Sequence, residues 1–90
     1  MSQPPLPSQD VQDSYVEGAR LQALRYQHKG VPSDLAPGEG KLVPHLCIHH
    51  MLDSGGDDIW YDYTYTVVFR NQWAVKLDET GIADDPPYRV

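Results

Sequence analysis

Apolar and aromatic residues occupy every second position over much of the second half of the chain. This spacing predicts β-strands with one buried and one exposed face. Three strands are predicted, at residues 45–53, 58–69 and 73–79, with turns at 55–56 and 70–72 between them. Their alternating apolar side chains are Leu46, Ile48, Leu52, Ile59, Tyr61, Tyr63, Tyr65, Val67, Phe69, Trp73, Val75 and Leu77.

The alternation also predicts how the strands pair, because residues opposite one another in an antiparallel sheet share a face. The turn at 70–72 places Phe69 opposite Trp73. Between the first two strands we expect Leu52 opposite Ile59, which brings the even-numbered residues of the first strand onto the apolar face. That face then holds about a dozen large side chains, whose burial supplies most of the stabilisation available to so small a domain.

Residues 9–29 have the pattern of an amphipathic helix instead, with apolar residues at helical spacing. Gly30 follows at the position where a left-handed C-terminal cap belongs. Gly18 lies inside the helix and indicates either a close contact or a break, since glycine is an unfavourable helix residue. We expect this helix to cover the apolar face of the sheet, including its row of tyrosines.

The predicted fold class is therefore α+β, with one N-terminal helix packed on a three-stranded antiparallel β-meander. A fourth, short edge strand at 41–43 also fits, within a connection at 31–44 that is either a binding loop or a mobile one. Residues 1–8 predict a disordered, proline-rich tail, residues 9–90 form one domain, and 80–90 should run irregularly. This architecture resembles the cystatin-type and nuclear-transport-factor-type folds, a resemblance that implies no particular function.

The charge balance limits the partners that the chain can bind. Thirteen acidic residues against seven basic ones give a net charge of −6, which argues against direct contact with nucleic acid or an anionic membrane and favours a basic partner. Cys47 is the only cysteine, which excludes a disulfide within the chain and favours the reducing cytoplasm. We expect neither a secretory leader nor a membrane span, which requires roughly 20 apolar residues.

The other face of the predicted sheet collects polar side chains. The expected pairing brings His45, Cys47, His49 and Asp62 together, and imidazole, thiolate and carboxylate groups are all zinc ligands. A zinc site and a solvated polar face both stay open as interpretations, and no other cofactor is expected. No feature supplies an oxyanion hole, so we predict no catalytic residue and favour a protein that is not an enzyme over a minor enzyme.

Acidic residues are predicted to gather at one end of the sheet, because an antiparallel meander brings the ends of the first and third strands to the same edge. Trp60, on the face that one helix leaves uncovered, is suited to anchor a partner. The same uncovered face suits a homodimer. The predicted partner-binding residues are Asp53, Asp57, Asp58, Trp60, Asp78, Glu79, Asp84, Asp85 and Tyr88.

Three functional hypotheses follow. The first is a small acidic protein that occludes a basic surface of a partner protein, as a phage-type inhibitor of a host nucleic-acid enzyme or a bacterial toxin-immunity protein does. The second is a small-ligand-binding domain with a pocket between helix and sheet, using His50, Tyr61, Tyr63 and Tyr65. The third is a zinc-binding protein that uses the histidine, cysteine and aspartate side chains named above.

Overall fold

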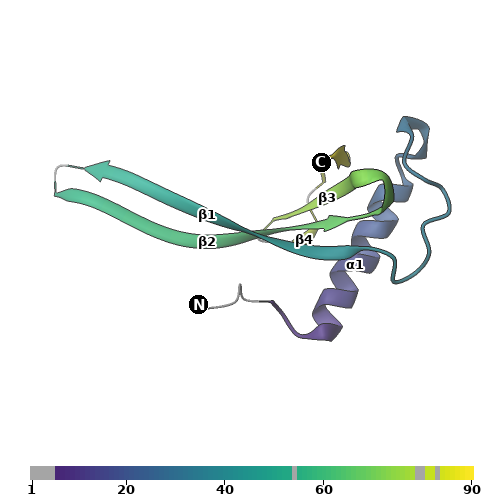
Figure 1. Cartoon of the computed structure of the whole chain (residues 1–90), viewed down its shortest axis with the longest axis horizontal. Coiled ribbons are helices and arrows are strands. Elements are labelled where there is room, and N and C mark those ends of the chain that lie inside the picture. Colours follow the sequence, from purple (N-terminus) through teal and green to yellow (C-terminus); the bar gives the residue numbers. More distant parts are fainter. Residues whose placement is uncertain (1–5, 54, 79–80, 83) are drawn as a thin grey trace.

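The structure, a computed structural model, describes residues 6–53, 55–78, 81–82 and 84–90. Residues 1–5 of the predicted tail lie outside this range. The described elements are the helix α1 (Gln9–Leu24), the 3₁₀ turns η1 (Gln27–Lys29) and η2 (Arg70–Gln72), and the strands β1 (Lys41–Asp53), β2 (Gly56–Val68), β3 (Trp73–Asp78), β4 (Gly81–Ile82) and β5 (Tyr88–Arg89), as Figure 1 shows.

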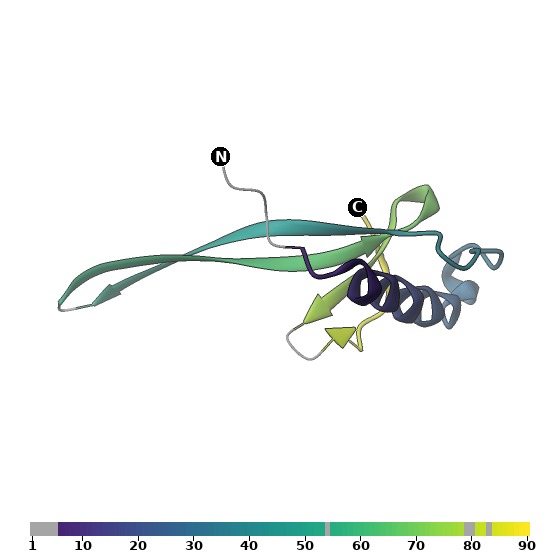
Figure 2. The ribbon, with the colours of Figure 1, turned by 90° about the horizontal axis from the view of Figure 1, so that it is seen from below.

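These strands form one open antiparallel sheet in the order β1-β2-β3-β4, and β5 also pairs with β3. The helix lies on one side of this sheet, near the end that carries β3 (Figure 2). The predicted α+β fold, a helix on an antiparallel sheet, is confirmed. The irregular course predicted for 80–90 is wrong at β4 and β5. The edge strand at 41–43 is the start of β1, which continues through Pro44 at the sheet edge, where a residue without an N–H donor is tolerated.

The α-helix ends at Leu24, earlier than predicted, and the chain reaches Gly30 through η1. Gly30 adopts the predicted left-handed conformation, with φ of 100°. At Gly18 the helix is unbroken, and a Cβ there would lie 3.3 Å from Cγ1 of Ile82. Of the two readings of Gly18, close contact is therefore the correct one, because the missing side chain lets β4 approach the helix.

The hydrophobic core lies between α1, the connection before β1 and one end of the sheet. Its buried side chains are Val16, Ala19, Ala23, Val31, Leu35, Leu42, Val67, Phe69, Trp73, Val75 and Leu77. Val31 and Leu35 belong to the connection that the sequence left as either a binding loop or a mobile loop. Their burial shows that this segment is part of the packed structure.

Arg70, in the turn between β2 and β3, also holds this connection. Its guanidinium donates to both carboxylate oxygens of Glu39, at 2.6 and 2.7 Å, and to Oδ1 of Asp34 at 3.0 Å. The hydrogen bonds from Arg70 to Glu39, followed by one from the backbone N–H of Ala36, lower the pKa of Glu39 to about 2. The ion pairs therefore tie the connection to the η2 turn.

The pairing of β2 with β3 is the predicted one, with Tyr65 opposite Leu77 and the N–H of Phe69 donating to the carbonyl of Trp73 at 2.7 Å. The pairing of β1 with β2 differs from the prediction by two residues, since Leu52 lies opposite Asp57 rather than Ile59. A shift of two leaves every side chain on its predicted face. The shift arises because β1 runs on to a tight turn in which its last residue pairs with the first residue of β2.

The β1–β2 hairpin extends far beyond the rest of the sheet. The last β2 residue paired with β3 is Tyr65, whereas β2 begins nine residues earlier, at Gly56. A 16-residue helix spans about 24 Å, while a 13-residue strand spans about 44 Å. We call residues 46–63 the arm and the remainder of the molecule the body. The arm gives the molecule its long axis of 53 Å, against 28 and 22 Å in the other directions (Figure 1).

Candidate functional site on the hairpin arm

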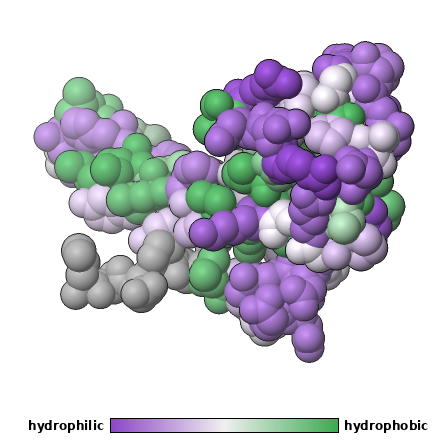
Figure 3. Space-filling model, turned by 45° about the vertical axis from the view of Figure 1, so that its right-hand side comes forward, coloured by the Kyte–Doolittle hydropathy of each residue, from purple (hydrophilic) through white to green (hydrophobic). Residues whose placement is uncertain are grey.

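One face of the arm is apolar and lies open to solvent. The exposed fractions are 54% for Leu46, 64% for Ile48, 72% for Leu52, 56% for Ile59 and 64% for Tyr61. We call these five residues the apolar face. Figure 3 shows hydrophobic side chains gathered on the arm in this way.

This exposure corrects the prediction that α1 covers the whole row of tyrosines. The helix covers the body end of the row, where Val67 and Phe69 are buried and Tyr65 packs partly against the core. From Tyr63 towards the hairpin turn, the helix no longer covers the row of side chains. The alternation identified the correct face, and the lengths of the elements decided how much of that face is covered.

The opposite face of the arm is mixed, and we call it the polar face: Cys47, His49, Met51, Asp58, Trp60 and Asp62. The rings of His49 and Trp60 are stacked, with centroids 5.2 Å apart and planes 10° apart. Nε2 of His49 also lies 2.9 Å from Oδ1 of Asp62. These contacts hold Trp60 against the strand pair while 44% of its surface remains exposed.

The four side chains of the predicted zinc site are distributed along the strands. His49 reaches Asp62, but Sγ of Cys47 contacts Oγ1 of Thr64 at 3.6 Å, and Nε2 of His45 contacts Oγ1 of Thr66 at 2.9 Å. Each of these three β1 side chains thus reaches diagonally to a different residue of β2. Among the described residues, no three His, Cys, Asp or Glu side chains form a group that could hold a metal ion. The zinc hypothesis stays a prediction without a preformed ligand set.

The predicted acidic end of the sheet is divided into two parts. Asp57 and Asp58 lie at the tip of the arm, with Asp53 across the turn, whereas Asp78 ends the much shorter β3. Asp58 lies seven positions before Tyr65, the partner of Leu77 in β3, a span of roughly 24 Å. The two sets do not meet because β3 stops at the start of the arm.

The remaining predicted partner-binding residues belong to the body. Asp84 and Asp85 lie between β4 and β5, and Tyr88 is in β5 beside the start of β3. Glu79 is outside the described residues. None of these three described side chains is part of the arm, so they form a surface separate from Trp60 and the tip.

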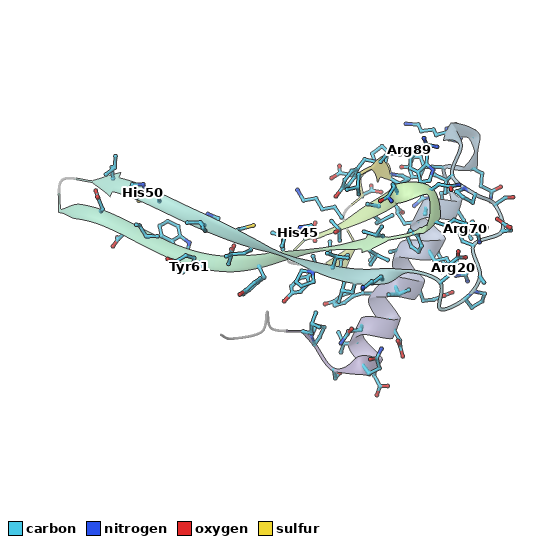
Figure 4. The ribbon with its side chains drawn as sticks, viewed as in Figure 1. Arg20, His45, His50, Tyr61, Arg70 and Arg89 are labelled. Carbon is cyan, nitrogen blue, oxygen red and sulfur yellow. The ribbon has the colours of Figure 1, made fainter. Side chains whose placement is uncertain are left out.

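All lysines and arginines lie on the body. Arg20, Arg70 and Arg89 all lie on the body, away from His50 and Tyr61 on the arm (Figure 4). The arm itself contains no lysine or arginine and carries four acids: Asp53, Asp57, Asp58 and Asp62. The arm therefore has a net charge of −4, while the rest of the chain, with nine acids against seven lysines and arginines, has −2.

An open cavity of about 590 Å³ lies where the arm meets the body. Its lining includes Tyr15 from α1, Leu42 from β1, and Tyr63, Tyr65 and Leu77 from the sheet. Two of the four predicted pocket residues thus line it, while Tyr61 and His50 lie farther out on the arm. His50 instead has Nε2 at 3.8 Å from Oδ2 of Asp57, near the tip. The small-ligand hypothesis stays a prediction that now rests on half of its original residues.

Comparison of the chain with protein families, curated proteins and solved structures gave no match. Among the described helices, none has the length and apolar character needed to cross a membrane. Function must therefore be argued from the arm itself, its two faces and its tip.

Proposed function

We propose that this protein is a non-enzymatic binding protein that occludes a basic surface of a partner protein with the tip and polar face of its arm. The observation that carries the proposal is the arm itself, which presents acidic and aromatic side chains beyond the body. Inhibition of a nucleic-acid enzyme and neutralisation of a toxin are two activities that such occlusion would serve.

Charge supports this function. The arm places its acids far from the arginines of the body, so a basic partner would meet a uniformly negative element. Such complementarity raises the association rate and disfavours acidic partners. A narrow hairpin also enters a groove that a rounded domain cannot enter, which is the geometry that occlusion of a nucleic-acid-binding cleft requires.

Trp60 supports the same face. Tryptophan is enriched among the residues that dominate binding energy at interfaces. Here its ring is held by the stack on His49 and remains partly exposed. A side chain that is already ordered loses less conformational freedom on binding than a mobile one. The polar face therefore combines a fixed aromatic anchor with the carboxylates of Asp58 and Asp62.

The test is capture of a partner from a lysate of the source organism by the immobilised full-length chain, followed by titration with the purified partner. The Asp58→Lys/Asp62→Lys double variant should lose the partner, and Trp60→Ala should weaken binding by about 2 kcal/mol. The matched control is Asp84→Lys/Asp85→Lys, which changes the charge equally but on the body and should retain the partner.

Salt provides a second readout. Binding of the purified partner should weaken at least about tenfold as the ionic strength rises from physiological to about 1 M, because the Debye length falls from about 8 to 3 Å. Binding that is indifferent to salt, or that both double variants lose equally, would reject the arm as the contact surface.

A further inference from the structure

The apolar face of the arm has no cover within the described part of the chain. Five large apolar side chains, each more than half exposed, present on the order of 500 Å² in a continuous row. A patch of this size is as large as the largest apolar patch on a typical monomer, which is often a functional surface. A two-stranded hairpin without packing on either face is also only marginally stable in water. An apolar surface of this kind marks a site of intermolecular contact.

We propose that this occupant is a second copy of the chain, with the two arms packed apolar face to apolar face in antiparallel orientation. A two-fold axis near the Ile48–Tyr61 pair would place each of these residues beside its counterpart. The inference goes beyond the proposed partner binding and does not depend on it, since it uses the opposite face of the arm.

The area is suited to such a dimer. A standard interface buries about 800 Å² on each partner, and the apolar face supplies more than half of that before the neighbouring His50 and Tyr63 are included. A dimer of this type also matches the general preference for closed two-fold symmetry, in which one patch complements itself.

The charges on the arm favour this occupant and this orientation. Around the Ile48–Tyr61 pair the apolar face carries no charged residue, so its centre suits an apolar partner surface such as its own copy. The one acid on this side of the arm, Asp57, lies opposite Leu52 near the tip. Acids lie instead at the tip, and a parallel pair of arms would bring the two negative tips together. In the antiparallel pair each tip lies near the other copy's body, so the two negative tips are kept apart.

The cavity at the base of the arm provides the matching recess. In β1, Leu52 lies four residues from Ile48 towards the tip, and Pro44 lies four residues from it towards the body, opposite Tyr65. The proposed axis therefore directs the partner's Leu52, the most exposed large residue of the apolar face, towards the cavity lined by Tyr63, Tyr65 and Leu42. Pairing of β1 edges into one sheet would leave all these side chains in water.

The first test is the mass of the full-length chain in solution, measured by sedimentation across the micromolar range. We expect twice the 10.2 kDa mass of one chain. Leu46→Glu and Met51→Glu are a matched pair, with side chains 54% and 53% exposed on opposite faces. Leu46→Glu should weaken the dimer about 100-fold, and Met51→Glu should leave it intact. A monomer at every concentration, or a dimer lost only in Met51→Glu, would overturn the proposal.

Complementation separates loss of the interface from loss of the fold. Because the axis passes near residue 48, two copies of Ile48→Glu should repel each other through their like charges, and so should two copies of Ile48→Lys. An equimolar mixture of the two variants should form a heterodimer. Circular dichroism of each variant alone reports whether it is folded. Two folded variants that stay monomeric when mixed would contradict the two-fold arrangement.

Cross-linking tests the orientation. In a Cys47→Ser background, Ile48→Cys should form a disulfide-linked dimer on mild oxidation, because the two sulfur atoms meet near the axis. Leu52→Cys should not cross-link to itself, since antiparallel arms keep the tips apart. Rapid cross-linking of Leu52→Cys with none at Ile48→Cys would mean that the arms are not antiparallel.

Discussion

The two ends of the β1–β2 hairpin have the same alternation and opposite environments. At the body end, Val67 is fully buried beneath α1, while on the arm Ile48 and Tyr61 are each 64% exposed. The strands are continuous and the faces are the same, so the side-chain pattern does not distinguish the two ends. What differs is the cover: the helix spans about half the length of the hairpin.

This comparison shows that an apolar stripe in the sequence predicts burial of its side chains but does not predict which element or molecule covers them. In the body they are covered within the chain, by α1 and by Leu35 from the connection before β1. On the arm, nothing in the described part of the chain covers them. An apolar stripe that continues past its cover is therefore evidence for an intermolecular contact.

The largest expected difference between the two regions is in stability. Phe69→Ala should lower the free energy of unfolding by about 3–5 kcal/mol, because it removes a buried ring and leaves a cavity. Tyr61→Ala, which removes a ring of similar size from the arm, should lower it by less than about 1 kcal/mol when the chain is dilute enough to be monomeric. Chemical denaturation of both variants measures the two values.

Equal losses for the two variants would mean that the arm is packed on the body in solution. The protein concentration is the control. If the arms pair as proposed, the effect of Tyr61→Ala should grow with concentration, since a dimer stabilises the folded state by mass action. The effect of Phe69→Ala should not grow with concentration in this way, because Phe69 is buried within one chain.

A smaller effect concerns the ion pairs of the body. Hydrogen bonds from Arg70, and then from the N–H of Ala36, lower the pKa of Glu39 from 4.5 to about 2, so the folded state favours its charged form. This stabilisation is fully present above pH 4.5 and is lost as the pH falls towards 2. Glu39→Gln should therefore flatten the fall in stability over that range. Denaturant titrations at several pH values measure the slope, and an unchanged slope would contradict the assignment.

The smallest expected effect is that of removing the arm. Replacing residues 48–61 by Asn-Gly joins the strands through a two-residue turn between Cys47 and Asp62, which are paired in the structure. Every residue of the buried core lies outside the deleted segment. The body should unfold cooperatively, with a free energy within about 1 kcal/mol of the monomeric full-length chain. Loss of the cooperative transition would show that the arm belongs to the folding unit.

Much of the fold could be predicted from local patterns. Period-two spacing identified β2, β3 and the correct faces, and the three-residue turn fixed Phe69 across from Trp73. The two-residue strands β4 and β5 could not be predicted, because so short a segment has no periodicity. They exist only because β3 offers a free edge to pair with.

The candidate site was less predictable. Trp60 was correctly placed on the uncovered side, but Leu46, Ile48 and Ile59 were assigned to the core. The signal that could have found them is the mismatch in strand lengths, since β3 is six residues long and β2 is thirteen. The zinc ligands were grouped by expected register, and diagonal contacts between strands separated them.

The sequence by itself determined which side chains share a face, because a strand turns its side chains to alternate sides whatever lies next to it. It also determined the distribution of charge along the chain, with no lysine or arginine between Lys41 and Arg70. Only the tertiary structure decided where burial stops, because burial depends on the reach of a second element, and α1 ends long before the hairpin does.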